Sequence, residues 1–173
     1  MTTDTARAIV EHVSARVSLQ SRWALDGFSA AAQQQPNWAD PVLERVAAVI
    51  SDVSDIEYVS GVIAEDDDQS VIHAAVVVIT ADLIVSATFT TPRNKLHPEG
   101  SVTVWLRAAV VRVSVDEVRH PEADEPDPRR QKPAASVTMH LRDDVELLLP
   151  ASIGRPYVWD TELYDYLPRL LKP

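Results

Sequence analysis

Five histidines have the widest chemical range in this chain, because imidazole can bind a metal or carry a proton near neutral pH. They are His12, His73, His97, His120 and His140. No two stand two or four residues apart, so the paired spacing of strand or helical zinc sites is missing. His73 lies in a strongly apolar segment, where it can serve as a ligand or a base. A packed, hydrogen-bonded histidine is the favoured interpretation.

Carboxylates are abundant, and the densest group runs from Glu65 to Asp68. Such oxygens suit hard cations, but calcium loops place them at alternate positions with a glycine turn and a distal glutamate. This run has none of that spacing, so a solvated hairpin turn is favoured. The pairs Asp116-Glu117 and Asp143-Asp144 carry little information in so acidic a chain. We therefore predict no metal site.

No pattern in the sequence commits the chain to catalysis. There is no cysteine, which removes thiolate nucleophiles, disulfides and zinc ribbons. A serine nucleophile needs a base and an orienting group, and no G-x-S-x-G turn marks one. With only four glycines, the chain has neither a P-loop nor a G-x-G-x-x-G turn. We predict no catalytic residue and no cofactor, and we favour a protein that is not an enzyme.

The net charge of −10 restricts the partners that the chain can have. Nucleic acids and anionic membrane surfaces repel a protein with this charge unless a local basic face overrides it, and no basic run is present. The N-terminal residues lack the basic and apolar regions of a signal peptide, so we expect a cytoplasmic protein. The excess of arginine over lysine, with much alanine and valine, suggests a bacterial or phage origin.

Trp105 and Arg107 are the candidate partner-binding residues. In the segment SVTVWLR they share the more polar of two alternating faces with Ser101 and Thr103. Tryptophan and arginine are enriched in the binding hot spots of protein interfaces. The alternative, which we favour, is that the N-terminal helices cover Trp105, because helices commonly cover one face of a sheet in α+β domains.

The most apolar stretch, residues 71–89, is nineteen residues long and has nearly the length of a membrane-spanning helix. Asp82 lies near its middle, where a charge is costly in a bilayer. Its many β-branched residues favour strands, and Thr80-Ala81-Asp82 has the length of a turn. We therefore predict a hairpin of strands 70–80 and 83–90 and no membrane span. The first strand is apolar on both faces, which predicts a helix over one of them.

Periodicity, caps and breakers predict the other elements. Expected helices cover residues 3–34, with a bend or break near 20–27, and residues from Asp40, as the cap, to about 52–55. Further strands are expected at 55–64, at 101–119 with a break near Ala108–Ala109, at 135–142 and at 145–150. Residues 90–100 and 120–133 read as loops. A helix over 159–171 is expected to be capped by Asp160 and bent or shortened by Pro168.

The order of these elements resembles the pleckstrin-homology-like barrel, including its bacterial forms, over residues 55–172. The segment Ile79–Leu83 matches the apolar–Thr–x–x–apolar turn that often joins a strand pair in that family. The resemblance implies that the C-terminal helix closes one end of the barrel. Family members that bind phosphoinositides carry Lys and Arg around the first strand–strand loop, where this chain has Glu65 to Asp68. Phosphoinositide binding is therefore not expected, and a protein partner is.

Together these observations predict an α+β fold. N-terminal helices pack on a bent antiparallel sheet or pleckstrin-homology-like barrel of about seven strands, with a C-terminal helix. Residues 1–54 form the helical segment and 55–173 the barrel or sheet, within one compact domain. The leading functional hypothesis is a non-enzymatic protein-interaction module that binds another protein or itself. The alternatives are a small-molecule binder or small enzyme with a pocket in the curved sheet, and a phage or mobile-element protein that blocks a host factor.

Overall fold

A computed structural model describes residues 3–20, 40–66, 70–92, 98–121, 131–153 and 160–172. Within these ranges the chain forms three α-helices and seven antiparallel strands, which confirms the α+β class. The strands make two sheets, and the described residues contain no closed barrel. The chain divides into two compact units, Met1–Arg107 and Ala108–Pro173, so the expected boundary after residue 54 lies inside the first unit.

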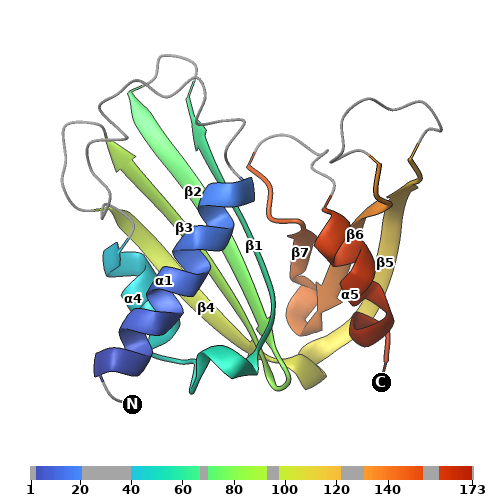
Figure 1. Cartoon of the computed structure of the whole chain (residues 1–173), viewed down its shortest axis with the longest axis horizontal. Coiled ribbons are helices and arrows are strands. Elements are labelled where there is room, and N and C mark those ends of the chain that lie inside the picture. Colours follow the sequence, from blue (N-terminus) through green and yellow to red (C-terminus); the bar gives the residue numbers. More distant parts are fainter. Residues whose placement is uncertain are drawn as a thin grey trace. The chain divides into compact units, whose positions relative to one another are not determined.

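The first unit is a four-stranded antiparallel sheet with helices on one face (Figure 1). Its strands follow one another in the order β1-β2-β3-β4, which is the order of the chain. The helices are α1 (Thr3–Gln20) and α4 (Asp40–Ala47), and the strands are β1 (Ile56–Glu65), β2 (Val71–Thr80), β3 (Leu83–Pro92) and β4 (Glu99–Leu106). The predicted helix over 21–34 and part of the loop predicted at 90–100 lie outside the described residues. The residue that precedes α4 and the side chain of Asp40, its predicted cap, are also not described.

The hairpin predicted for the most apolar stretch is confirmed as β2 and β3. Its strands pair from Val71 with Pro92 to Ile79 with Ile84. The turn is stabilised by Thr80, whose Oγ1 accepts hydrogen bonds from the backbone N–H of Leu83 at 2.9 Å and of Asp82 at 3.3 Å. The Thr80 hydroxyl thereby supplies a nearby hydrogen-bond acceptor for backbone N–H groups at a two-residue turn. In the part of the chain that the structure describes, no helix is long and apolar enough to cross a membrane.

The helices cover one face of the sheet. On this face the alternating side chains of β2 and β3 are mostly apolar. Every second residue along each strand contributes to this core, because successive side chains point to opposite faces of a sheet. From the sheet the core residues include Val59, Val76, Val78, Val85 and Ala87, and from the helices Ile9, Val13, Val17, Val42 and Val46. The predicted helical cover over β2 is therefore confirmed. α1 packs on β1 and on α4, and α4 packs on β3 and β4.

The second unit is a three-stranded antiparallel sheet with one helix. Its strands are β5 (Val110–Arg119), β6 (Ala134–Leu141) and β7 (Glu146–Leu149), paired in that order, and its helix is α5 (Thr161–Leu170). The expected break in residues 101–119 is present as a 3-10 turn, Arg107–Ala109, between β4 and β5. Much of the expected loop at 120–133 falls at 122–130, outside the described residues.

Helix α5 begins where the sequence predicts, because Asp160 caps it. The Asp160 carboxylate accepts a hydrogen bond from the Glu162 backbone N–H at 2.8 Å. The helix ends two residues after Pro168, and it packs against β6. Its buried residues repeat at helical spacing: Leu163, Tyr166, Leu167 and Leu170.

Asp52 lies just before β1 in the sequence and gives the first unit a pH-dependent contribution to stability. It caps the 3-10 turn Val53–Asp55, because its Oδ1 accepts from the Ser54 backbone N–H at 2.9 Å and from Ser54 Oγ at 2.8 Å. These hydrogen bonds, the backbone one first, hold the pKa of Asp52 below its ordinary value. A carboxyl with a lower pKa in the folded chain stabilises it above the unfolded-state pKa of about 3.9, and this contribution is lost as the pH falls through the folded-state value.

We expect Asp52→Ala to lower the melting temperature at pH 7. The difference from the wild type should shrink at pH 3, which lies below the unfolded-state pKa, because the contribution of the ionised cap diminishes as the pH falls from there toward the folded-state value. Thermal unfolding followed by circular dichroism at the two pH values measures this. An equal difference at both pH values would mean that the charge of Asp52 does not contribute.

Candidate functional site

Trp105 lies on the side of the first sheet that α1 and α4 do not cover. β4 pairs with β3 in a register that sets Trp105 opposite Ile84 and Val104 opposite Val85. Val85 belongs to the core beneath the helices, and Val102 packs against that core. Since successive side chains alternate between faces, Trp105 points to the other face, where it is half-buried. The favoured interpretation that the N-terminal helices cover Trp105 is wrong for α1 and α4.

Arg107 joins three parts of the first unit. Its Nη1 lies 2.5 Å from Glu57 Oε2 on β1 and donates to the Thr80 carbonyl at 3.2 Å. Its backbone N–H donates to the Asp82 carbonyl at 2.7 Å, in the β2–β3 turn. The Arg107 side chain is 22% exposed and that of Glu57 28%. Arg107 therefore holds one end of the sheet together, and its guanidinium is already engaged within the chain.

From Ser101 to Leu106 the outer edge of β4 lacks the features that usually block pairing with another strand, whereas at Gly100 the carbonyl is bonded to the Arg45 guanidinium. From Gly100 to Leu106 the strand carries no charged residue and no proline. Its register with β3 is unbroken, from Leu83 opposite Leu106 to Thr90 opposite Glu99. Among the described strands β4 has only β3 as a neighbour. Natural proteins usually blunt such an edge with charges, prolines or bulges, so an unprotected one is a pairing surface.

The backbone groups that face this edge follow from the alternation of an antiparallel strand, in which one residue turns both its N–H and its C=O to the same side. Arg107 donates toward the β2–β3 turn, whereas the Gly100 carbonyl accepts from Arg45 Nη1 of α4 at 3.0 Å. The even-numbered residues therefore direct their N–H and C=O away from β3. Of these, Val104 is 40% exposed and Leu106 66%.

The edges of the second sheet differ from that of β4. β5 is interrupted by two register shifts, one between Val110 and Arg112 and one between Val115 and Glu117. It also carries charged side chains at Arg112, Asp116, Glu117 and Arg119. β7 has only four residues. Bulges, charges and shortness are the usual protections of an edge, so these strands offer a poorer surface than β4.

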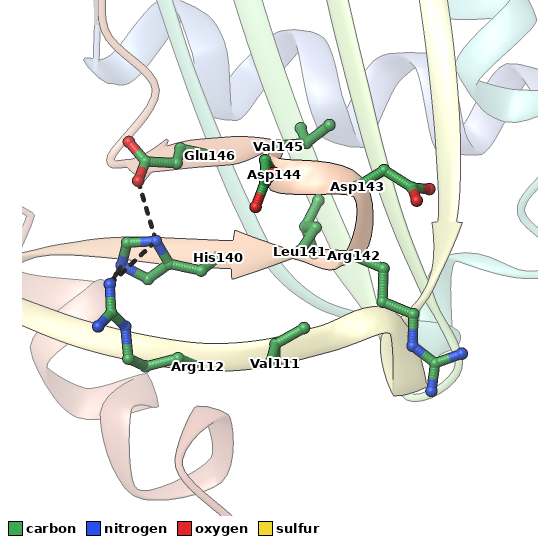
Figure 2. Close-up of a pocket in the computed structure, with 9 residues that line it drawn as sticks. All are labelled: Val111, Arg112, His140, Leu141, Arg142, Asp143, Asp144, Val145 and Glu146. Atoms are coloured by element: carbon green, nitrogen blue, oxygen red, sulfur yellow. Dashed lines mark hydrogen bonds and ion pairs between the residues drawn. The ribbon is translucent and has the colours of Figure 1, made fainter.

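A second cluster, which the sequence did not reveal, lies on the polar face of the second sheet. His140 of β6 is its centre (Figure 2). Its Nδ1 lies 3.0 Å from Glu146 Oε1 on β7, and its Nε2 lies 3.0 Å from Ser114 Oγ on β5. Arg112 Nη2, also on β5, lies 3.0 Å from the same Nε2. We name these four residues the His140 cluster.

Three residues of the His140 cluster, Arg112, His140 and Glu146, line an open hollow of about 640 Å³. The hollow is lined by Val111, Arg112 and residues 140–146, so its rim includes the β6–β7 turn (Figure 2). In that turn Asp143 and Asp144 have φ values of 65° and 56°. Aspartate tolerates this left-handed region better than most residues. Asp143 and Asp144 therefore form a tight turn between β6 and β7, and both residues line the hollow.

The other candidate residues have local structural roles or lie outside the described residues. Asp66 closes the β1–β2 connection, since its carboxylate accepts from the Val71 backbone N–H at 3.0 Å and from Ser70 Oγ at 3.1 Å. Residues 67–69 and His97 are not described. His73 is half-buried on β2, opposite Ala64 and Thr90. The described residues contain no group of three or more histidines and carboxylates able to hold a metal ion.

Comparison with known proteins adds no relative: no protein-family model, curated protein or solved structure matches this chain.

Proposed function

We propose that this chain is a protein-interaction module that assembles with a second copy of itself through the edge of β4. The observation that carries the proposal is the uncharged, unbulged run Gly100–Leu106, whose outer backbone groups have no strand beside them among the described residues. A strand added to such an edge gains main-chain hydrogen bonds, and side chains at alternate positions set its specificity. Two-fold dimers are the commonest homo-oligomers, and their interface must be complementary to itself.

The sequence of β4 is complementary to itself when the β4 strands of two copies run antiparallel and the two-fold axis passes through Thr103. Val102 then faces Val104 of the second copy, and both residues have N–H and C=O groups on the outer side of the strand. In an antiparallel pair, residues so placed exchange two hydrogen bonds. The tripeptide Val102-Thr103-Val104 reads the same in both directions, so the pairing places like residues at like positions.

The side chains outside this centre are matched in size. In the same register Trp105 faces Ser101 of the second copy, and Leu106 faces Gly100. A large residue opposite a small one on each face lets the two strands approach without crowding. Trp105 keeps the partner-binding role proposed from the sequence, on the face away from α1 and α4. Arg107 does not share that role, because its guanidinium holds Glu57 and Thr80.

The net charge of each copy determines how the stability of the dimer should respond to salt. Each copy has a net charge of −10, so two copies repel at long range, while the paired run itself is uncharged. Added salt screens such repulsion over about 8–10 Å at physiological ionic strength. The dimer is therefore expected to strengthen as salt rises, opposite to the behaviour of a complex held by ion pairs.

The proposed likeness to the pleckstrin-homology-like family rests on element order alone, seven strands followed by a terminal helix, since the described strands form two sheets and no closed barrel. Many members of that family bind proteins, which agrees with an interaction module. A cytoplasmic location and a bacterial or phage origin are proposed from composition alone. If β4 instead receives a strand from a host protein, the chain would suit the blocking role considered above.

The test uses two proline variants of neighbouring residues. In Val104→Pro the lost N–H points to the open edge, so the β3–β4 bonds and the fold are expected to stay, and the dimer should dissociate at least about tenfold more readily. In Thr103→Pro, the matched control, the lost N–H bonds to β3, and the fold itself should weaken. Light scattering after size-exclusion chromatography, over a range of protein and salt concentrations, measures association, and circular dichroism measures folding.

A wild-type chain that stays monomeric at every protein and salt concentration would refute self-assembly. A dimer that Val104→Pro leaves unchanged would show that another surface holds it. Equal loss of folding in both variants would contradict the assignment of outward groups on β4. Binding of a different protein that Val104→Pro abolishes, with a monomeric wild type, would refute the second copy as occupant and leave the β4 edge as the binding surface.

A further inference from the structure

The geometry points to a nucleophilic serine at the His140 cluster, and we propose that Ser114 is acylated by small carboxylic esters. This proposal concerns the second unit and is independent of the β4 edge. It rests on three side chains from three neighbouring strands that meet in the order serine, histidine, carboxylate. Ser114 Oγ is 3.0 Å from His140 Nε2, and His140 Nδ1 is 3.0 Å from Glu146 Oε1.

Each of these contacts has a defined part in activating a hydroxyl. A serine hydroxyl is a weak nucleophile until an adjacent base accepts its proton. The Glu146 carboxylate accepts a hydrogen bond from Nδ1–H in this proposal, which orients the ring and leaves the lone pair of Nε2 facing β5. Ser114 stands at that lone pair. The same roles recur in serine hydrolases of unrelated folds, in which geometry and not sequence position identifies the three residues.

Arg112 supplies a positive charge beside the nucleophile. Its Nη2 lies 3.0 Å from Nε2 and 3.4 Å from Nδ1, so the guanidinium lies over the face of the imidazole ring and leaves the edge at Nε2 to the serine hydroxyl. A carbonyl oxygen that becomes negative during attack is stabilised by donors placed beside it. We assign this donor role to Arg112. The hollow of about 640 Å³ is lined by Arg112, His140 and Glu146 and not by Ser114, so a small ester bound in it would lie beside the three partners of the serine.

The sheet holds the cluster without help from a loop. Ser114 faces Thr138 across β5 and β6, while His140 faces Arg112 on one side and Glu146 on the other. Thr138 Oγ1 donates to Asp116 Oδ2 at 2.7 Å, which ties the strand pair beside Ser114. The His140 side chain is 20% exposed, so it has limited freedom to leave this position. Sites on strands hold their side chains more precisely than sites on loops.

The reaction balances with water as the only co-reactant. Ser114 Oγ bonds to the ester carbonyl carbon, and its proton passes to His140 Nε2. The carbon–oxygen bond to the alcohol breaks, and the alcohol leaves with that proton. Water then attacks the acyl-serine, gives a proton to Nε2, and the acid departs as Ser114 Oγ regains the proton. The sum is ester and water to carboxylic acid and alcohol.

The experiment uses a fluorophosphonate probe and p-nitrophenyl acetate on the whole chain. The probe is expected to add to Ser114, located by mass spectrometry of the digested protein. Ser114→Ala should remove the labelling, and His140→Gln should slow it by about 10²- to 10⁴-fold, the usual contribution of a general base. Glu146→Gln and Arg112→Ala should each lower ester hydrolysis by a smaller factor. Ser136→Ala, a serine on the same strand as His140, is the control and should react like the wild type.

Three results would overturn the proposal. One is a wild-type chain that the probe does not label. Another is labelling of Ser114 that His140→Gln leaves unchanged, since the serine would then react without its base. The third is ester hydrolysis that survives in Ser114→Ala, which would make His140 itself the nucleophile. Circular dichroism of each of the five variants tests whether the chain is still folded.

Discussion

Gly61→Ala will lower the free energy of unfolding by about 1–3 kcal/mol, the usual cost of an extra methyl group in a packed interior. Gly61 lies on β1 directly beneath α1. A Cβ at this position would stand 2.5 Å from Val17 Cγ2 and 3.2 Å from Val17 Cβ. Val17 is 6% exposed and β-branched, so it has few other rotamers to adopt. α1 would have to move away from the sheet.

A double-mutant cycle identifies this contact as the cause. Val17→Ala alone removes two buried methyl groups and is expected to cost about 1–3 kcal/mol. In the Gly61→Ala chain the same substitution also removes the clash, so the double variant should be more stable than the sum of the two losses predicts. Urea unfolding of the four chains measures the cycle. Strict additivity would show that Gly61 and Val17 do not crowd each other.

Arg107→Ala is expected to cost about 1.5–3 kcal/mol, the range for hydrogen bonds to charged groups. The substitution removes the bond to the Thr80 carbonyl and leaves Glu57, 28% exposed, without its guanidinium partner. The ion pair of Arg7 with Glu11 on α1 is the matched control, because those side chains are 79% and 65% exposed. Arg7→Ala should cost only about 0.3–0.5 kcal/mol, as an exposed pair on a helix does.

Urea unfolding at low and high salt distinguishes the two arginines. The loss caused by Arg7→Ala should diminish in salt, because water and ions screen that pair. The loss caused by Arg107→Ala should persist. Equal losses for the two variants would contradict the structural role of Arg107. A folded Arg107→Ala chain should still self-associate, whereas a direct role of Arg107 in the interface would weaken the dimer.

Most of the secondary structure could be predicted from the sequence because its causes are local. The β-branched run with Asp82 after Thr80 predicted the β2–β3 hairpin, and Asp160 predicted the start of α5. The break near Ala108–Ala109 was also correct to within one residue. Strand period, turn chemistry and helix caps depend on neighbours a few positions away, and such signals can be read from the chain itself.

The candidate sites could not be predicted in the same way, because they depend on which strands pair and in what register. Alternation placed Trp105 and Arg107 together, but the structure turns Trp105 away from α1 and α4 and ties Arg107 to Glu57 on β1. Nothing local marks β4 as an edge strand. That property exists only once the order of the sheet is known.

The sequence by itself determined an acidic α+β chain with a buried hairpin, a capped terminal helix and no recognisable catalytic motif. Only the tertiary structure decided that Ser114, His140 and Glu146 meet. They come from three strands, and the two register shifts in β5 set which of its residues reach His140. A shift of one residue reverses the face to which every following side chain points. Periodicity along one strand is therefore a local property, whereas contact across a sheet depends on the register that the folded core selects.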